Sequence, residues 1–67
     1  MTAIPKAAAA RLLSEAGAQR VGIKAAEDFA DILEDIALDI SEKAVKIARH
    51  SGRKTVKKED IILAAQV

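Results

Sequence analysis

The sequence predicts an all-α fold made of a short helix, a long central helix and a second short helix. Apolar residues between positions 23 and 51 recur at steps of three and four, which is the period of an α-helix. Gly17 and Gly52 interrupt this pattern where helices are expected to end. The length of 67 residues allows one domain, spanning residues 1–67.

The first helix is expected from about Pro5 to Ala16. Proline suits a first turn because the N–H that it lacks would have no partner there. Ala9, Leu12, Leu13 and Ala16 form an apolar stripe at helical spacing. Gly17 supplies the left-handed residue that commonly follows the end of a helix.

The second helix is expected from Ile23 to Ser51, a length of about 40 Å at 1.5 Å per residue. Its apolar residues lie on one face, and no other segment of this short chain is long enough to cover that face. We therefore expect a second copy of the chain to cover it. The residues predicted to form the core of that dimer are Phe29, Leu33, Ile36, Ile40 and Ala44.

The third helix is expected from Val56 or Lys57 to Ala65, with Thr55 as a candidate N-cap. Glu59 and Asp60 would lie in its first turn, where the helix dipole favours negative charge. An isolated helix this short is unstable in water, so it must pack on the long helix.

The composition leaves oligomerisation as the main source of extra stability. A domain of this size buries too little surface to be very stable alone. No cysteine is present, and the single histidine cannot bind zinc alone, so neither a disulfide nor a metal site is expected, and no cofactor. The N-terminal residues do not resemble a signal peptide, and no apolar run is long enough to span a membrane. We expect a soluble intracellular protein without a membrane partner.

The net charge of +1 conceals a strong separation of charge along the chain. Residues 27–42 contain seven acidic residues and no basic one, whereas residues 43–58 contain seven basic residues and no acidic one. This order predicts separate negative and positive zones on the folded protein.

The second expected loop carries the most specific sequence. The run from Ala48 to Val56, ARHSGRKTV, followed by Glu59-Asp60-Ile61, resembles the loop and last helix of archaeal histones. The run from Ala16 to Val21, AGAQRV, resembles their first loop, and the segment lengths between the two also match. The resemblance covers nearly the whole chain. It implies a histone fold that forms an intertwined head-to-tail dimer, in which each first loop lies beside the partner's second loop and contacts double-stranded DNA.

The resemblance also implies roles for individual residues. Arg20 would enter the minor groove, and Arg11 would contact DNA from the first helix. Arg53, Lys54 and Thr55 would bind phosphates from the second loop, with Lys57 as a further phosphate contact. Basic side chains that neutralise phosphates bind DNA with strong salt dependence and little sequence preference. The absence of asparagine, and the lack of glutamines arrayed along a helix, argue against base-specific recognition.

Two further surfaces follow from the resemblance. Ile47, His50, Asp60 and Leu63 match the residues through which two dimers associate into tetramers or longer polymers. Gly17, Glu15 and Arg49 match positions where successive turns of a DNA superhelix come close. From the residues alone, His50 also fits an exposed position near a helix end, and Arg53 and Asp60 could instead form an ion pair that positions the second loop.

The function expected from these features is to bind, bend or wrap and compact DNA on the chromosome in the cytoplasm. The alternative is a histone-fold subunit that pairs with a different chain, such as a related histone, in a transcription assembly. Catalysis is not expected, because neighbouring helical residues such as His50 and Ser51 do not face each other and no phosphate-binding glycine loop is present.

Overall fold

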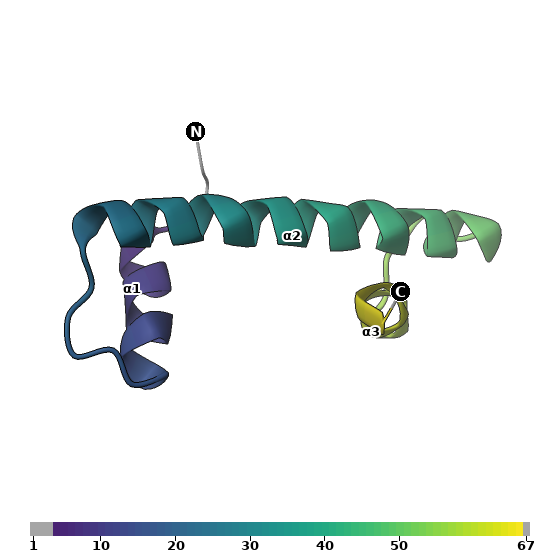
Figure 1. Cartoon of the computed structure of the whole chain (residues 1–67). Helices are drawn as coiled ribbons and strands as arrows, with labels where there is room; N and C mark the ends of the chain where they lie inside the picture. The colour runs from purple at the N-terminus through teal and green to yellow at the C-terminus, as the bar shows by residue number, and fades with distance from the viewer. Residues whose placement is uncertain (1–3, 67) are drawn as a thin grey trace. The chain divides into compact units, whose positions relative to one another are not determined.

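The computed structural model of the protein describes residues 4–66. It contains three α-helices, α1 (Lys6–Glu15), α2 (Ile23–His50) and α3 (Lys58–Gln66), which Figure 1 shows in chain order. No strand occurs within residues 4–66, so the prediction of an all-α fold is confirmed. The predicted start of α2 at Ile23 is confirmed, and the other predicted helix ends differ from the observed ones by one or two residues.

The chain divides into two compact units, and the boundary between them falls after Asp35. We call them the N-terminal unit, which contains α1 and the first part of α2, and the C-terminal unit, which contains the rest of α2 and α3. Each is described by itself. The assignment of residues 1–67 to a single domain stays a prediction.

In the N-terminal unit, α1 crosses the first turns of α2 (Figure 1). Pro5 is the N-cap of α1 and lies in the extended conformation, so it precedes the helix rather than occupying its first turn as predicted. The buried residues of this unit are Ala9, Ala26 and Ala30. A contact made only by alanines lets two helices approach closely but buries little apolar surface.

In the C-terminal unit, α3 packs on the last turns of α2 (Figure 1). Its buried residues are again small, namely Ala44, Ala48 and Ala64, together with the charged Asp60. Apart from that carboxylate, this contact has the same alanine composition as the one in the N-terminal unit.

The two helices that precede loops end with the same hydrogen-bond motif. After α1, the N–H of Gly17 bonds to the carbonyl of Ser14 at 3.0 Å, and the N–H of Ala18 to that of Leu13 at 3.0 Å. After α2, Gly52 and Arg53 bond in the same way to Arg49 and Ala48, both at 2.9 Å. These are Schellman motifs, which require a residue with positive φ, and φ is 117° at Gly17 and 73° at Gly52. The predicted helix stops at both glycines are confirmed.

The larger apolar side chains are poorly covered within one chain. Among residues 4–66, no large side chain is less than 2% exposed, and the buried apolar residues are six alanines. Nine large aliphatic side chains are instead exposed: Leu12, Ile23, Ile32, Ile36, Leu38, Val56, Ile61, Ile62 and Leu63. Burial of such side chains is the main stabilising contribution in folding. A single chain therefore lacks the apolar core that a stable domain needs.

None of the helices described over residues 4–66 is both long enough and apolar enough to cross a membrane.

Candidate nucleic-acid interface

Two loops carry the cations that the sequence predicted to contact DNA. The first loop connects α1 to α2 over residues 16–22, and the second loop connects α2 to α3 over residues 51–57. Arg20 is exposed in the first loop, and Lys54, Thr55 and Lys57 are exposed in the second. The first loop thus presents one basic side chain to solvent and the second loop two, as phosphate binding requires.

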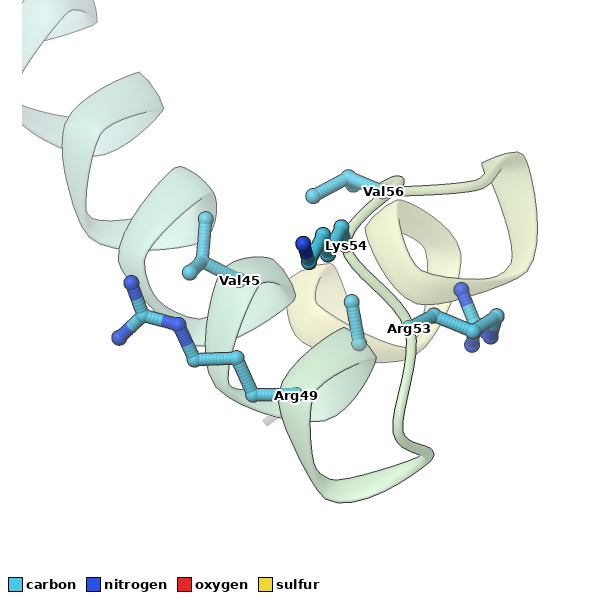
Figure 2. Close-up of a pocket in the computed structure, with 6 residues that line it drawn as sticks. Val45, Arg49, Arg53, Lys54 and Val56 are labelled. Carbon is cyan, nitrogen blue, oxygen red and sulfur yellow. The ribbon is translucent and has the colours of Figure 1, made fainter.

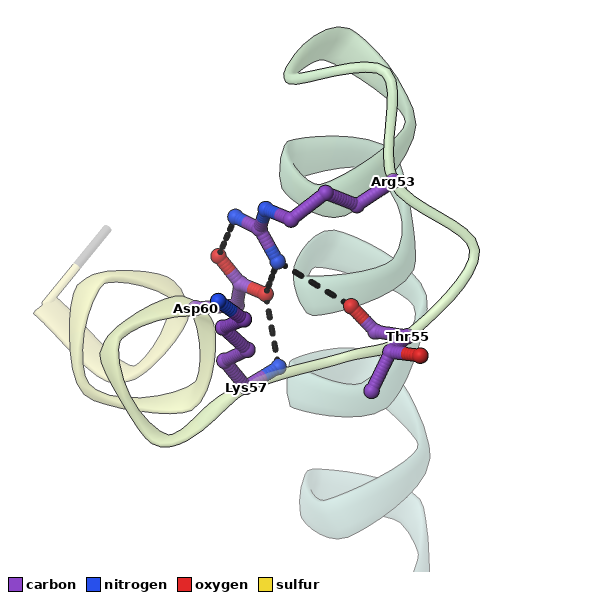
Figure 3. A network of polar contacts seen from close by, with 4 residues as sticks. All are labelled: Arg53, Thr55, Lys57 and Asp60. Atoms are coloured by element: carbon purple, nitrogen blue, oxygen red, sulfur yellow. Dashed lines mark hydrogen bonds and ion pairs between the residues drawn. The ribbon is translucent and has the colours of Figure 1, made fainter.

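An ion pair between Arg53 and Asp60 closes the second loop onto the start of α3 (Figure 3). The Nη1 and Nη2 atoms of Arg53 donate to the two carboxylate oxygens of Asp60, each at 2.8 Å. Arg53 Nη1 also donates to the backbone carbonyl of Thr55 at 3.0 Å. The backbone N–H of Lys57 donates to Asp60 Oδ2 at 2.8 Å. We call this set of four hydrogen bonds the loop clasp.

The loop clasp caps α3 at its N-terminus. The carbonyl of Lys57 accepts the first helical bonds, from the N–H groups of Asp60 and Ile61. Lys57 is therefore the N-cap, and Asp60, three residues later, accepts a bond from the N–H of Lys57 as the acidic residue of a capping box does. The candidate N-cap Thr55 is wrong, because α3 begins at Lys58, three residues later.

The same contacts determine the ionisation of the pair. The hydrogen bonds from the Arg53 guanidinium and then from the Lys57 N–H lower the pKa of Asp60 to about 2, against a desolvation effect that raises it. The carboxylate in turn raises the pKa of Arg53. Both groups are charged throughout the physiological pH range, so the clasp is a bidentate, charge-assisted contact.

The loop clasp separates the second-loop residues into two kinds. The guanidinium of Arg53 makes three hydrogen bonds within the chain, and its side chain is 29% exposed. The possibility that Arg53 and Asp60 form an ion pair positioning the loop is thus confirmed. Lys54, Thr55 and Lys57 are exposed on the segment that the clasp fixes, and they remain the predicted phosphate contacts.

A cavity of about 260 Å³ lies beside the second loop (Figure 2). Val45, Ala48 and Val56 form its apolar part, with Arg49, Arg53 and Lys54 around it. Figure 2 shows Arg49 and Arg53 on opposite sides of the view, with Val45, Lys54 and Val56 between them. The sequence pattern does not predict this cavity, because the cavity joins residues of α2 to a loop whose path no periodicity predicts.

In α1, Arg11 forms an ion pair with Glu15, one helical turn further along. The side chains are 64% and 60% exposed, so water screens the pair and it stabilises the helix only weakly. The predicted DNA contact at Arg11 and the predicted stacking contact at Glu15 therefore involve residues that contact each other in the single chain.

The residues predicted for the dimer core differ in exposure. Ile36 is 52% exposed, and Phe29, Leu33 and Ile40 are half-buried. Ala44 is fully buried within its own chain, so it has no surface left to offer a partner.

The residues predicted for contacts between dimers also differ. His50 is exposed, Leu63 is 49% exposed and Ile47 is half-buried. Asp60 is only 2% exposed and bonds to Arg53 and Lys57. Its carboxylate is thus committed to the loop clasp, whereas the other three residues are available to a neighbour. Gly17 and Arg49, predicted for stacking, are both exposed.

Within residues 4–66, no three histidine, aspartate or glutamate side chains lie close enough together to hold a metal ion.

Comparison with known proteins gives consistent matches over almost the full length. The family model described as "Histone-like transcription factor (CBF/NF-Y) and archaeal histone" matches residues 2–65. One of the subunits of archaeal histone HAN1 from Thermococcus zilligii is 47% identical over 66 residues, which cover 98% of each chain. Probable archaeal histone 3 from Methanocaldococcus jannaschii is 51% identical over 61 residues, which cover 91% of each chain.

Proposed function

The chain belongs to the family of histone-like transcription factors (CBF/NF-Y) and archaeal histones, and from that premise we propose that it is an architectural protein that binds double-stranded DNA as a dimer. The observation that carries the proposal is the second loop. Its segment 53–57 is held by the loop clasp, and Lys54, Thr55 and Lys57 are exposed along it. A fixed loop with outward cations holds phosphates without losing much conformational entropy on binding.

Dimerisation is part of this proposal, because one chain leaves its large aliphatic residues uncovered. A second copy placed along the stripe of Phe29, Leu33, Ile36 and Ile40 would bury these four side chains. It would also bring the first loop of one chain beside the second loop of the other. Arg20 would then act with the partner's Lys54 and Thr55 on one stretch of DNA. Arg11 would add a contact by leaving Glu15 for a phosphate.

We further propose that dimers associate through Ile47, His50 and Leu63 into tetramers or polymers that wrap and compact DNA on the chromosome in the cytoplasm. Gly17, Glu15 and Arg49 would lie where successive turns come close. His50→Ala is expected to leave the dimer intact and to reduce its assembly into larger complexes on DNA, measured by nuclease protection at increasing protein ratio. Unchanged protection would refute this role of His50.

The DNA contacts are tested by gel shift and by fluorescence anisotropy on duplexes of unrelated sequence at several salt concentrations. Arg20→Ala combined with Lys54→Ala is expected to reduce affinity by more than about tenfold and to flatten the salt dependence, because fewer counterions are released. Lys24→Ala provides the control, since it removes a cation outside both loops and is expected to weaken binding less than Lys54→Ala. If Lys24→Ala and Lys54→Ala reduce the DNA affinity equally, binding depends on the net charge of the chain and not on the loops.

A second candidate is an interaction protein that pairs with a related histone-fold chain. The Thermococcus zilligii relative, which is named as a subunit, favours keeping this alternative. Sedimentation of the purified chain separates the two: a folded dimer of the chain alone supports the DNA-binding homodimer, whereas an unfolded chain that becomes helical only with a second histone supports the alternative. In both cases the proposed role is structural and not enzymatic.

A further inference from the structure

In the C-terminal unit, α2 carries a groove on the side opposite Ile36 and Ile40. The groove has a volume of about 400 Å³ and is lined by Leu38, Ser41, Glu42, Val45, Lys46 and Arg49. Leu38 lies two residues from both Ile36 and Ile40, and two residues turn an α-helix by about 200°. We call this hollow the outer groove. A second copy packed on the apolar stripe would therefore leave the outer groove uncovered.

The floor of the outer groove is apolar. Leu38 is 58% exposed, and Val45, seven residues further along the same side of the helix, is half-buried. The hydroxyl of Ser41 donates to the carbonyl of Ala37 at 2.7 Å, so this polar group already has a partner within α2. Exposed aliphatic side chains in a hollow with a polar rim are typical of binding sites. The floor therefore fits an aliphatic side chain of another molecule.

The rim of the outer groove is basic on balance. Lys46 and Arg49 are exposed, and neither side chain forms an ion pair within residues 4–66. Glu42 is the only acidic residue among those that line the groove. DNA fits poorly there, because its charged phosphates would lie against the apolar floor and close to Glu42. The chemistry that fits both rim and floor is an aliphatic side chain with carboxylates beside it.

We propose that the outer groove is the docking site for an acidic amphipathic helix of another protein. The rows of side chains on α2 accept the rows of a second helix, whose aliphatic residues would pack on Leu38 and Val45. Its carboxylates would pair with Lys46 and Arg49. The groove contains none of the predicted DNA contacts, so one chain can hold DNA and this partner together. The inference goes beyond the proposed function, which concerns the loops and the apolar stripe.

A second copy of the chain fits the outer groove less well than an acidic helix does. Among the exposed aliphatic residues, Leu12, Ile23 and Val56 each adjoin a basic residue, which the cations of the groove would repel. Ile32 has acidic neighbours, but it follows Phe29 by three residues and so lies beside the stripe that the proposed dimer covers. Charge complementarity thus favours a different protein as the occupant.

A synthetic peptide tests the proposal on the full chain. The probe is a fluorescent helix of about fifteen residues, with leucines at helical spacing and glutamates beside them. Fluorescence anisotropy measures its Kd. Leu38→Ser is expected to raise this Kd at least about tenfold, because the leucines of the peptide lose their apolar contact. Lys46→Glu is expected to raise it by a similar factor, because an attraction becomes a repulsion. A peptide with serines in place of the leucines should bind the wild type about tenfold more weakly.

Ile62→Ser and Lys58→Glu are the matched controls, because they make similar changes at exposed residues of α3 outside the groove. Both should bind the peptide like the wild type. The proposal is overturned if the wild type does not bind the peptide, if the controls lose as much affinity as the groove variants, or if the serine peptide binds equally well. It is also overturned if Leu38→Ser reduces self-association in sedimentation, since the occupant is then a second copy. A wild-type chain that binds the peptide but not DNA would contradict only the proposed function.

Discussion

The two loops begin in the same way and then differ in what fixes them. Both follow a helix that ends in a Schellman motif with glycine at positive φ. The second loop is then fastened by the clasp, which joins Arg53 to Thr55 and Asp60. In the first loop, residues 18–22 make no side-chain hydrogen bond or ion pair to any part of the chain that the structure describes. Side-chain contacts within one chain thus fix the second loop, whereas the first loop is fixed only by backbone hydrogen bonds at the end of α1.

Loss of the clasp carboxylate should have the largest effect on the stability of the folded chain. Asp60→Ala leaves the Arg53 guanidinium and the Lys57 N–H without their shared acceptor in a part-buried position, which is costlier than losing an exposed pair. We expect the equilibrium constant for unfolding to rise more than about a hundredfold, measured by thermal and urea denaturation at fixed protein concentration. Glu59→Ala, which removes a neighbouring exposed acid, is the control. If the two variants lose similar stability, the clasp carboxylate stabilises the second loop no more than its exposed neighbour does.

The clasp should also make the C-terminal unit sensitive to acid. The pKa of Asp60 is about 2 in the folded chain and 3.8 for the free carboxyl. The unfolded chain therefore takes up the proton first, and the stabilising effect is complete above about pH 4 and is lost as the pH falls towards 2. The stability difference between the wild type and Asp60→Asn should shrink over this interval. A difference independent of pH would show that the ionised carboxylate contributes nothing.

The two glycines should differ although they occupy equivalent positions. An added Cβ would meet no atom within 4 Å at either site, so the cost of alanine comes from the backbone alone. The φ of 73° at Gly52 is close to the left-handed region that L-residues can reach, whereas 117° at Gly17 lies well outside it. We expect Gly52→Ala to cost about 1 kcal/mol and Gly17→Ala about 2–3 kcal/mol. Urea denaturation measures both, and the reverse order would contradict the argument.

The smallest effect on stability is expected for Arg20. Arg20→Ala should change the free energy of unfolding by less than about 0.5 kcal/mol, because its side chain is exposed and makes no ion pair within residues 4–66. It should still weaken DNA binding. Arg53→Ala should reduce both stability and DNA binding, since it releases the second loop. Equal stability losses in the two variants would mean that the first loop is also fastened within the chain.

The sequence was sufficient for the parts of the fold that depend on local signals. Helical periodicity predicted α2, and Gly17 and Gly52 marked the helix ends. The start of α3 was misplaced, because Thr55 is a good N-cap by residue type and the Arg53–Asp60 pair overrides that preference. An aspartate three residues after Lys57 was the available signal.

The candidate site was only partly predictable for a related reason. Residue type indicates which cations can bind phosphate, but not which already have a partner in the chain. Arg53 and Arg11 belong to the same chemical class as Arg20, and only the folded chain shows that they bond to Asp60 and Glu15. Likewise, periodicity placed Ala44 on the apolar stripe, but only the packing of its unit shows that it is already buried.

If one chain cannot supply its own apolar core, its stability must depend on a second chain. Sedimentation equilibrium combined with thermal denaturation over a hundredfold range of protein concentration tests this directly. We predict a folded dimer whose Tm rises with concentration, because unfolding then includes dissociation. A folded monomer with a Tm independent of concentration would contradict the account.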